Sequence, residues 1–349
     1  MGLIKMPSEI EVKPAITVLI YGEPGIGKTT TGCSAPNAVL FDFDGGVQRI
    51  NGAHRVPTVQ VHSWREALDA LDEVARELPD TQSIIIDTAG KMLDFMSAYI
   101  IAGGERGMIN KDGTLSLKGY GVRKQMFIDF NFKVTHMGKN VVYIAHEREE
   151  KRGEETVKRP EIGGSSANDL IKELDLVGYM RAIGKKRTIT FDPDEKWYAK
   201  NTCNLPAEIN VPTTVDDAGN AIAENNFLCK IIDTYAEVQR KNQESTRVYD
   251  ALIGKLKTAI AAINSAAMAN EFIGKMNEVS HIFNSKIVVR RLFSERVAEL
   301  KLVYDAETKT YADAPKAEPK AEGKKAPADA KAKAKASAES KESGKTAEA

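Results

Sequence analysis

Residues 22–29 read Gly-Glu-Pro-Gly-Ile-Gly-Lys-Thr and match the pattern GxxxxGK(S/T) at every fixed position. Glycines at these places let the backbone wrap around a phosphate, so that successive N–H groups point at its oxygens. The ammonium group of Lys28 can neutralise charge on the β- and γ-phosphates, and the hydroxyl of Thr29 can hold a magnesium ion. The stretch therefore predicts a loop that grips a nucleoside triphosphate. The residues expected to contact the nucleotide are Gly22, Glu23, Pro24, Gly25, Ile26, Gly27, Lys28, Thr29 and Thr30.

The loop lies between a predicted strand and a predicted helix, as a phosphate-binding loop requires. A nearly continuous run of β-branched and aliphatic residues, 15–21, leads into it. Similar runs follow at 38–42, 83–87 and 141–145. Such continuity is typical of strands that are buried on both faces of a parallel sheet.

Helical patterns separate these strands. Residues 64–78 place apolar side chains at helical spacing, and 120–137 are long enough for another helix. Because successive parallel strands are joined by right-handed crossovers, this order predicts an α/β fold with a mostly parallel, doubly wound sheet. We expect a P-loop NTPase core over residues 15–240, preceded by an N-terminal arm, 1–14.

The pattern changes in the second half of the chain. Short runs with turn residues between them predict an antiparallel extension of the sheet. These runs are 176–183, 187–191 and 197–200. Apolar residues at helical spacing predict a small helical appendage over 245–304. The residues 312–349 are rich in Ala and Lys and offer nothing that could form a core, so they are expected to be a disordered tail.

Composition narrows the class of protein. Lys+Arg and Asp+Glu number 49 each, so the net charge favours no polyanionic partner. Cys33, Cys203 and Cys229 are widely separated, which argues against a disulfide framework and fits a reducing compartment. The chain does not open like a signal peptide, and no run approaches the roughly 18 apolar residues of a membrane span. We therefore expect a cytoplasmic protein without a membrane partner.

A magnesium-bound triphosphate needs a carboxylate near the metal, and Asp87 is the predicted one. It ends the apolar run 83–87, at the edge of the sheet where the phosphate-binding loop is expected. We expect Thr29 and Asp87 to hold the magnesium, directly or through water. The alternative is an aspartate that only ends a buried strand.

Two further strand ends carry polar residues. Asp42 and Asp44 come at the end of the run 38–42 and just after it, and a carboxylate here could orient and deprotonate water. The alternative is that one of them caps the turn that follows. His146 comes directly after the run 141–145 and could sense the γ-phosphate, although a lone histidine is often structural.

The order of these motifs resembles the RecA-like ATPase core. The stretches EPGIGKTT, VLFDFDGG, IIIDTAG and VVYIAHE are similar to those of phage nucleotide-binding, AAA-domain proteins, which include RecA-like recombinases and single-strand annealing ATPases. The resemblance covers about residues 14–210. It implies ATP with Mg²⁺, a homo-oligomeric ring or filament, single-stranded DNA as a partner, and a location in the host cytoplasm.

The resemblance also assigns site residues. Asp44 falls where the family has its water-activating glutamate, which is one methylene longer, and His146 falls at the sensor glutamine. With Lys28 and Asp87 they make up the expected catalytic set. Residues 147–165 and 103–115 stand where RecA-like proteins have mobile DNA-binding loops.

Lys200 matches the first of two family lysines that reach across a filament interface to the triphosphate of a neighbouring subunit. Thr202 stands where the second lysine belongs. Other cations lie nearby and could substitute for it; they are Lys185, Lys186 and Arg187. The alternative is a solvated basic hairpin.

Two functions follow from these features. The first is an ATP-hydrolysing phage DNA recombination protein that binds and anneals single-stranded DNA, with hydrolysis that is slow or DNA-stimulated. The second is a nucleotide-gated assembly or adaptor protein with little turnover, which recruits a replication or recombination partner such as a single-strand-binding protein. The short Asp44, the missing second lysine and the slightly negative charge of 147–165 favour the second hypothesis.

Overall fold

The computed structural model describes residues 4–11, 15–163 and 171–313. The chain divides into two compact units, Met1–Leu252 and Ile253–Ala349. In the described ranges no helix combines the length and the apolar character that crossing a membrane requires.

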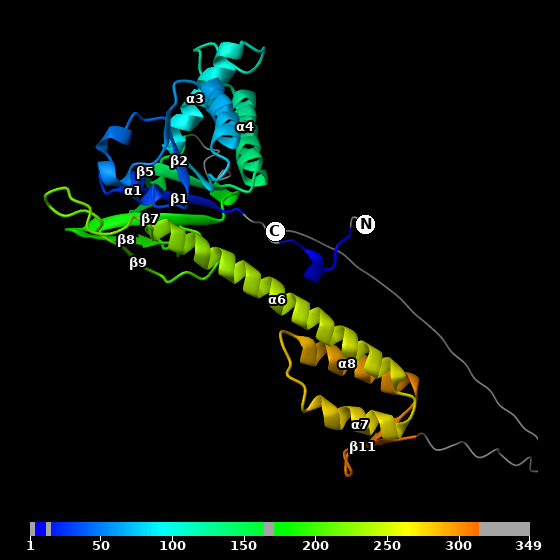
Figure 1. The fold of residues 1–349 in the computed structure, drawn as a ribbon. Coiled ribbons are helices and arrows are strands. Elements are labelled where there is room, and N and C mark those ends of the chain that lie inside the picture. The colour runs from blue at the N-terminus through cyan, green and yellow to red at the C-terminus, as the bar shows by residue number, and fades with distance from the viewer. Residues whose placement is uncertain (1–3, 12–14, 164–170, 314–349) are drawn as a thin grey trace, which may run out of the picture. The chain divides into compact units, whose positions relative to one another are not determined.

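The first unit is built on a mixed sheet, which has nine strands in the described ranges (Figure 1). Their order is β3-β2-β4-β5-β1-β7-β8-β9, with β6 paired to β5. The strands from β3 to β7 in this order run parallel, and β8 and β9 continue the sheet antiparallel. This confirms the predicted α/β fold with a mostly parallel sheet. The main strands are β1 (Thr17–Gly22), β2 (Ala38–Asp42), β3 (Thr58–Gln60), β4 (Ser83–Asp87), β7 (Leu176–Ile183), β8 (Lys186–Thr190) and β9 (Ile209–Val211).

The central strands are apolar throughout because both faces of the sheet are covered. Successive side chains of a strand point to opposite faces. In β4, Ile84 and Ile86 belong to one hydrophobic cluster, whereas Ile85 belongs to the other. A run of consecutive isoleucines therefore serves two cores at once.

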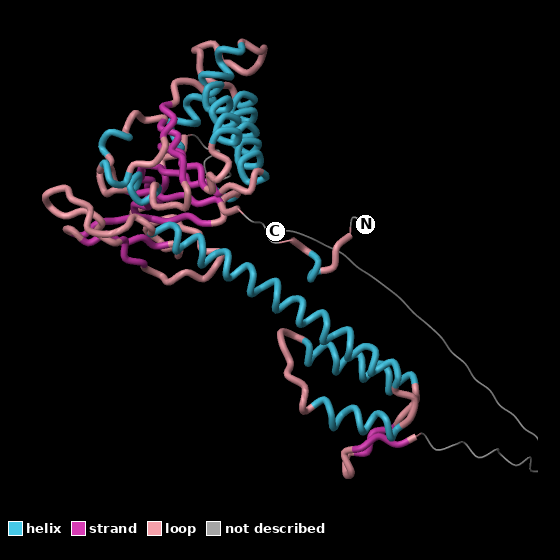
Figure 2. Tube along the Cα trace, in the orientation of Figure 1, coloured by secondary structure: helices cyan, strands magenta, loops and turns pink. Residues whose placement is uncertain are grey.

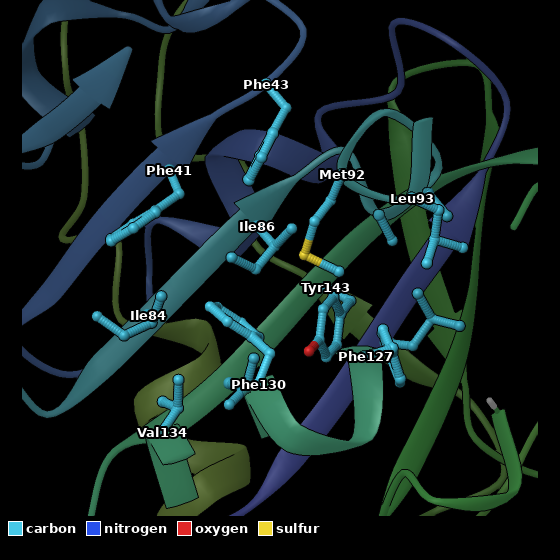
Figure 3. Close-up of a cluster of buried hydrophobic side chains, with 14 of the residues drawn as sticks. Phe41, Phe43, Ile84, Ile86, Met92, Leu93, Phe127, Phe130, Val134 and Tyr143 are labelled. Carbon is cyan, nitrogen blue, oxygen red and sulfur yellow. The ribbon is translucent and has the colours of Figure 1, made fainter. Parts of the chain in front are cut away.

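Three helices cover the first face of the sheet, and Figure 3 shows part of the core that they form. Phe127 and Phe130 lie against Ile86 and Tyr143 there, and Met92 fills the space next to them. The hydroxyl of Tyr143 has a partner in this apolar setting, because it donates to the side-chain oxygen of Asn131 at 2.6 Å. The helices are α2 (Trp64–Glu77), α3 (Ala89–Gly103) and α4 (Leu117–His136).

The second face is covered by α1 (Lys28–Gly32) and the start of α6 (Phe227–Ala262). Hydrogen bonds join these two elements. Ser34 Oγ accepts from the backbone N–H of Leu228 at 2.9 Å, and the Asn225 amide donates to the carbonyl of Thr30 at 2.7 Å. The helix that follows the phosphate-binding loop is thus anchored on the first turn of α6.

Residues 147–160 form a β-hairpin and not the loop that was expected there, whereas their mobility and a role in DNA binding stay predictions. β5 (Asn140–Arg152) continues beyond its buried part and is paired antiparallel with β6 (Glu155–Pro160). The backbone ladder needs no apolar side chains, which is why the charged sequence did not reveal it. Residues 164–165 of the predicted loop lie outside the described residues.

Other elements also differ from expectation. The sequence did not predict β3, α3 or β9, and the predicted strand at 197–200 makes only two isolated bridges, Lys158↔Trp197 and Val177↔Lys200. The edge strand β3 has three residues and is half-buried, so it carries little pattern. Helix α3 is capped by the Thr88 side chain, which accepts from the backbone N–H of Lys91.

The second unit contains the end of α6, two shorter helices and a small hairpin (Figure 2). Phe293 stacks on Phe272 with ring centroids 5.4 Å apart, and Tyr311 meets its edge at 5.6 Å. The elements are α7 (Ala266–Met276), α8 (Ser285–Glu299), β10 (Val303–Asp305) and β11 (Thr310–Ala312). Most of the predicted tail, 314–349, lies outside the described residues, as do 1–3 and 12–14 of the predicted arm.

Candidate functional site

The phosphate-binding loop joins β1 to α1. A Cβ atom at Gly22 would lie 2.1 Å from the backbone oxygen of Met180 in β7, so only glycine fits at this strand end. Gly27 has a φ of +94°, in the region that favours glycine, and it immediately precedes the first residue of α1. The chain can therefore turn tightly from strand to helix, which leaves the start of α1 facing the pocket.

Lys28 begins α1, and its ammonium group folds back over the loop. It donates to the carbonyls of Gly22 at 3.0 Å and Glu23 at 2.7 Å. The residue is 5% exposed, and burial lowers the pKa of Lys28, against the opposing effect of Asp87. Carbonyls satisfy the ammonium protons without neutralising the charge, so the group is still available to attract an anion.

Thr29 and Asp87 meet across the pocket. The Thr29 hydroxyl donates to a carboxylate oxygen of Asp87 at 2.6 Å. Asp87 is 5% exposed, and burial raises its pKa; the hydrogen bond from Thr29 opposes this shift, while Asp42 and Asp44 add to it. A desolvated carboxylate beside other acids gains stability when a cation arrives.

The two acids at the carboxyl end of β2, Asp42 and Asp44, have different surroundings in the structure. The carboxylate of Asp42 accepts the backbone N–H groups of Gly46 and Val47, each at 3.0 Å, so this residue caps the turn. Asp44 lines the pocket instead. Its backbone N–H donates to the Asp87 carbonyl at 3.2 Å, which holds it beside the neighbouring strand end.

His146 lies directly opposite Gly22 in the pairing of β5 with β1. It lines the same pocket, and its Nδ1 atom is buried without a hydrogen-bond partner among the described residues. Its carbonyl accepts the backbone N–H of Glu161 at 2.7 Å, which ties the base of the hairpin to the site. A buried, unpaired ring nitrogen is costly, and a polar ligand in the pocket would remove that cost.

These side chains line one pocket of about 200 Å³, which we call the phosphate pocket. The predicted residues that it brings together are Gly25, Gly27, Lys28, Thr29, Thr30, Asp44, Asp87 and His146. The loop residues outside its lining are Gly22, Glu23, Pro24 and Ile26. Lining residues that the sequence did not single out are Gly46, Arg49, Ile50, Thr88 and Ile144. Arg49 follows Asp42 and Asp44 closely in the sequence, and a cation at that distance from paired acids was the one feature from which its place in the pocket could have been predicted.

A second pocket, of about 430 Å³, adjoins the loop and shares Gly27 and Thr30 with the phosphate pocket. Arg187 lies in its wall, with Nε donating to the carbonyl of Ile26 at 2.8 Å. The lining also includes the segment 211–217, the turn residues Gly184 and Lys185, and residues around the start of α6. The two pockets therefore meet at the loop.

Lys200 lies outside the lining of both pockets. Its ammonium group donates to the carbonyl of Lys172 at 2.9 Å and to that of Leu174. These bonds hold the side chain on its own chain. The role of Lys200 at the triphosphate of a neighbouring subunit therefore stays a prediction.

The oxygen donors at the site fit magnesium. In the described ranges no group of three or more His, Cys, Asp and Glu side chains could hold a metal ion. Magnesium needs no such group, because it keeps waters and binds substrate phosphates alongside one or two protein oxygens. The hydroxyl of Thr29 and the carboxylate of Asp87, which touch at 2.6 Å, are two such oxygens.

Comparison with known proteins agrees with this geometry. None of the curated proteins matches the chain. The family described as "AAA domain" matches residues 15–203, which is more than half of the chain and contains every residue of the phosphate pocket. On the strength of that match and of the loop between β1 and α1, the chain belongs to the AAA-domain family, and its matched region is a P-loop NTPase domain.

Proposed function

We propose that this protein binds ATP with magnesium and hydrolyses it to ADP and phosphate. The observation that carries the proposal is the convergence of Lys28, the Thr29–Asp87 pair, Asp44 and His146 on one pocket of about 200 Å³. They come from the loop and the first turn of α1, from the segment just after β2, from the end of β4 and from the middle of β5. The parallel strands bring their carboxyl ends to one edge of the sheet, and the residues found there are of the types that bind a phosphate and a metal ion.

Each residue has a role that its surroundings support. The ammonium of Lys28 neutralises charge on the β- and γ-phosphates, since its protein contacts are neutral carbonyls. Asp44, whose side chain is 28% exposed, orients the attacking water and takes its proton. A magnesium ion held by Thr29 and Asp87 would offset the charge of the phosphate oxygens. His146 donates a hydrogen bond to the γ-phosphate through the ring nitrogen that has no described partner.

The nucleoside is proposed to occupy the second pocket. The backbone of Gly27 and the side chain of Thr30 connect the two spaces, so a nucleotide can extend from one into the other. ATP rather than GTP is inferred from the resemblance to RecA-like proteins and from the lack of an NKxD motif in the sequence.

We further propose that hydrolysis serves DNA recombination, with the protein acting as a homo-oligomer on single-stranded DNA. Support comes from the resemblance of the motif order to phage recombinases and annealing ATPases. Support also comes from the hairpin, which continues directly from His146 and carries Arg148 and Lys151 on exposed positions. A nucleotide-dependent shift at His146 would reach the hairpin through one strand.

A nucleotide-gated adaptor is the second candidate, and two observations favour it. Lys200 is bonded to carbonyls of its own chain. The hairpin cation Lys158 is paired with Glu147 at 2.7 Å and Glu149 at 2.8 Å. These two carboxylates compete with DNA phosphates for its ammonium group. This function needs ATP binding but little turnover.

The decisive experiment measures ATP binding and phosphate release for the wild type, Lys28→Ala and the control Lys91→Ala. Lys91 is an exposed lysine of α3 outside the phosphate pocket. We expect Lys28→Ala to reduce hydrolysis by about 100-fold or more, because a preorganised cation is lost, while the control stays at the wild-type rate. Equal rates for all three proteins would contradict the proposed ATPase.

The DNA function is tested separately, by anisotropy of labelled single-stranded DNA with ATP or ADP at low and high salt, and by strand annealing. Binding that depends on ATP and weakens with salt, together with DNA-stimulated phosphate release, would support recombination. Tight ATP binding with slow hydrolysis that DNA leaves unchanged would support the adaptor instead.

A further inference from the structure

The phosphate pocket has a second cationic side chain, Arg49, which the roles above do not use. Arg49 is the last residue of the short helix η2 (Val47–Arg49), which follows the turn after β2. It lines the pocket together with Lys28, and these two are the Lys and Arg residues among the described lining.

The backbone around Arg49 is held firmly, whereas its side chain is not. The carboxylate of Asp42 caps the start of the turn, and the Arg49 N–H donates to the Gly46 carbonyl at 3.0 Å. On the other side, the guanidinium of Arg55 donates to the carbonyls of Gln48 and Ile50 at 2.9 and 3.0 Å. The Arg49 side chain is 77% exposed. A fixed base with a free guanidinium can reach a ligand without moving the fold.

The one ion pair that the described residues give Arg49 is weak. Its NH1 atom lies 3.8 Å from a carboxylate oxygen of Asp44, beyond hydrogen-bond distance, and the pair is open to solvent. A terminal phosphate in the pocket would offer more negative charge and a geometry that the guanidinium fork can bind with two hydrogen bonds. The phosphate is therefore the stronger partner.

We propose that Arg49 binds the terminal phosphate of the nucleotide in cis, from the same chain that supplies Lys28. This inference rests on the proposed ATP site. Contact with the phosphate draws the guanidinium away from Asp44, which leaves that carboxylate to hold the attacking water. Arg49 would also supply, from the same chain, a cation at the triphosphate, which is the role that the resemblance assigned to Lys200 of a neighbouring subunit. The Lys200 ammonium is instead bonded to carbonyls of its own chain.

The test compares ATP and ADP affinities for the wild type, Arg49→Ala, Arg49→Lys and the control Arg76→Ala. Arg76 is a similarly exposed arginine, 70% for its side chain, that pairs with Glu77 on α2. For Arg49→Ala we expect ATP affinity to fall about tenfold with ADP affinity within about twofold of wild type, because the proposed contact is to the γ-phosphate, which ADP lacks. Hydrolysis should fall about 100-fold, and Arg49→Lys should recover part of it, since lysine keeps the charge but not the fork.

The outcomes separate this inference from the proposed function. A wild type that binds neither nucleotide would overturn both. A wild type that binds and hydrolyses ATP, with Arg49→Ala unchanged or weakened equally for ATP and ADP, would overturn the role of Arg49 alone. Because the comparison uses affinities, it applies even if turnover is slow.

Mixing variants tests the assignment in cis. If Arg49 served a neighbouring subunit, Arg49→Ala chains would supply an intact loop and Lys28→Ala chains an intact arginine, so a mixture would regain activity. We expect the mixture to show only the sum of the two residual rates. Recovery above that sum would overturn the assignment in cis.

Discussion

The phosphate pocket and the β5–β6 hairpin are both rich in charge, but they balance it in opposite ways. In the hairpin, Lys158 meets Glu147 at 2.7 Å, and that carboxylate side chain is 8% exposed. In the pocket, the Lys28 ammonium rests on neutral carbonyls, and Arg49 stays 3.8 Å from Asp44. Lys158 of the hairpin is thus neutralised before any ligand arrives, whereas Lys28 and Arg49 of the pocket have no close carboxylate partner among the described residues.

This difference shows that a high density of charged residues does not by itself mark a binding site. Charged residues without a close partner of opposite charge are the better indication. The sequence pointed to the charged residues of 147–165 as a site for nucleic acid, yet many of those charges complete one another. The pocket holds fewer charged groups, and the ion pair that the described residues form there, Arg49 with Asp44, is 3.8 Å long. Charges in the hairpin should therefore stabilise the fold, whereas those in the pocket should cost stability and serve a ligand.

The largest expected effect separates the two acids of the turn after β2. Asp44→Asn should lower the hydrolysis rate by about 1000-fold, because the amide cannot take a proton from water. It should hardly change the free energy of unfolding. Steady-state phosphate release and chemical denaturation measure the two quantities.

The matched variant is Asp42→Asn. It should lower the free energy of unfolding by about 1 kcal/mol, since one of the two acceptors for the turn N–H groups is replaced by a donor. If Asp42→Asn instead abolished hydrolysis without destabilising the chain, the division of roles between these acids would be wrong.

A smaller effect is expected in the hairpin. Lys158→Met should lower the free energy of unfolding by about 2 kcal/mol, because it leaves the buried Glu147 with the Tyr179 hydroxyl, at 3.1 Å, but without its cation. ADP affinity should not change. Urea denaturation checks the first quantity and calorimetric titration the second.

Two controls sharpen this prediction. Lys151→Met, an exposed lysine of the same hairpin, should have little effect. The double variant Lys158→Met with Glu147→Gln should lose less stability than the single variant, because no unpaired charge is left behind. Equal losses for Lys158→Met and Lys151→Met would show that the pair contributes nothing.

The smallest expected effect concerns the nucleotide-free pocket. Burial raises the pKa of Asp87, so the folded chain holds that proton more tightly than the unfolded chain does. Stability is then fully present below the unfolded pKa and is lost as pH rises through the raised value. Asp87→Asn should therefore raise the Tm at pH ~7.5 by about 2–4 °C, for a gain near 1 kcal/mol.

The same dependence of stability on the protonation of Asp87 provides a control for the Asp87→Asn variant at low pH. At pH ~2.5, well below the unfolded pKa of about 3.9, the wild-type carboxyl is protonated in both states, so the difference in Tm should vanish there. A variant that melts below the wild type at pH ~7.5 would show that the Thr29 hydrogen bond outweighs desolvation. Calorimetric scans at both pH values decide between these results.

Much of the fold could be predicted from the sequence, because its central strands are buried on both faces. The runs at β1, β2 and β4 are continuous in apolar residues, and α2 shows a clear apolar stripe. Helix α3 was missed because apolar residues such as the exposed Tyr99 also lie outside its core face. The hairpin was missed because both of its faces carry charge, so no alternation marks its strands.

The candidate site likewise has a part that could be predicted from the sequence and a part that could not. The loop and Asp87 follow from local motifs, because a glycine pattern and a strand end can be recognised without knowing the rest of the fold. The contributions of Arg49 and Lys200 depend on where other segments lie. Arg49 reaches the pocket through the path of a turn, and the Lys200 ammonium is bonded to carbonyls that precede β7.

The hydrogen bonds between the α1 region and the start of α6 indicate which residues a shortened protein must keep to form a stable sheet. The family match stops at residue 203, but the core on the second face also needs Leu228, Ile231 and Tyr235. A protein shortened to the matched region would keep every residue of the phosphate pocket but lose the segment 211–217 of the second pocket. It would also leave that apolar face open to water and remove the Leu228 N–H that donates to the Ser34 hydroxyl. We therefore expect the smallest stable fragment that keeps the nucleotide site to extend into α6, past the point where family similarity ends.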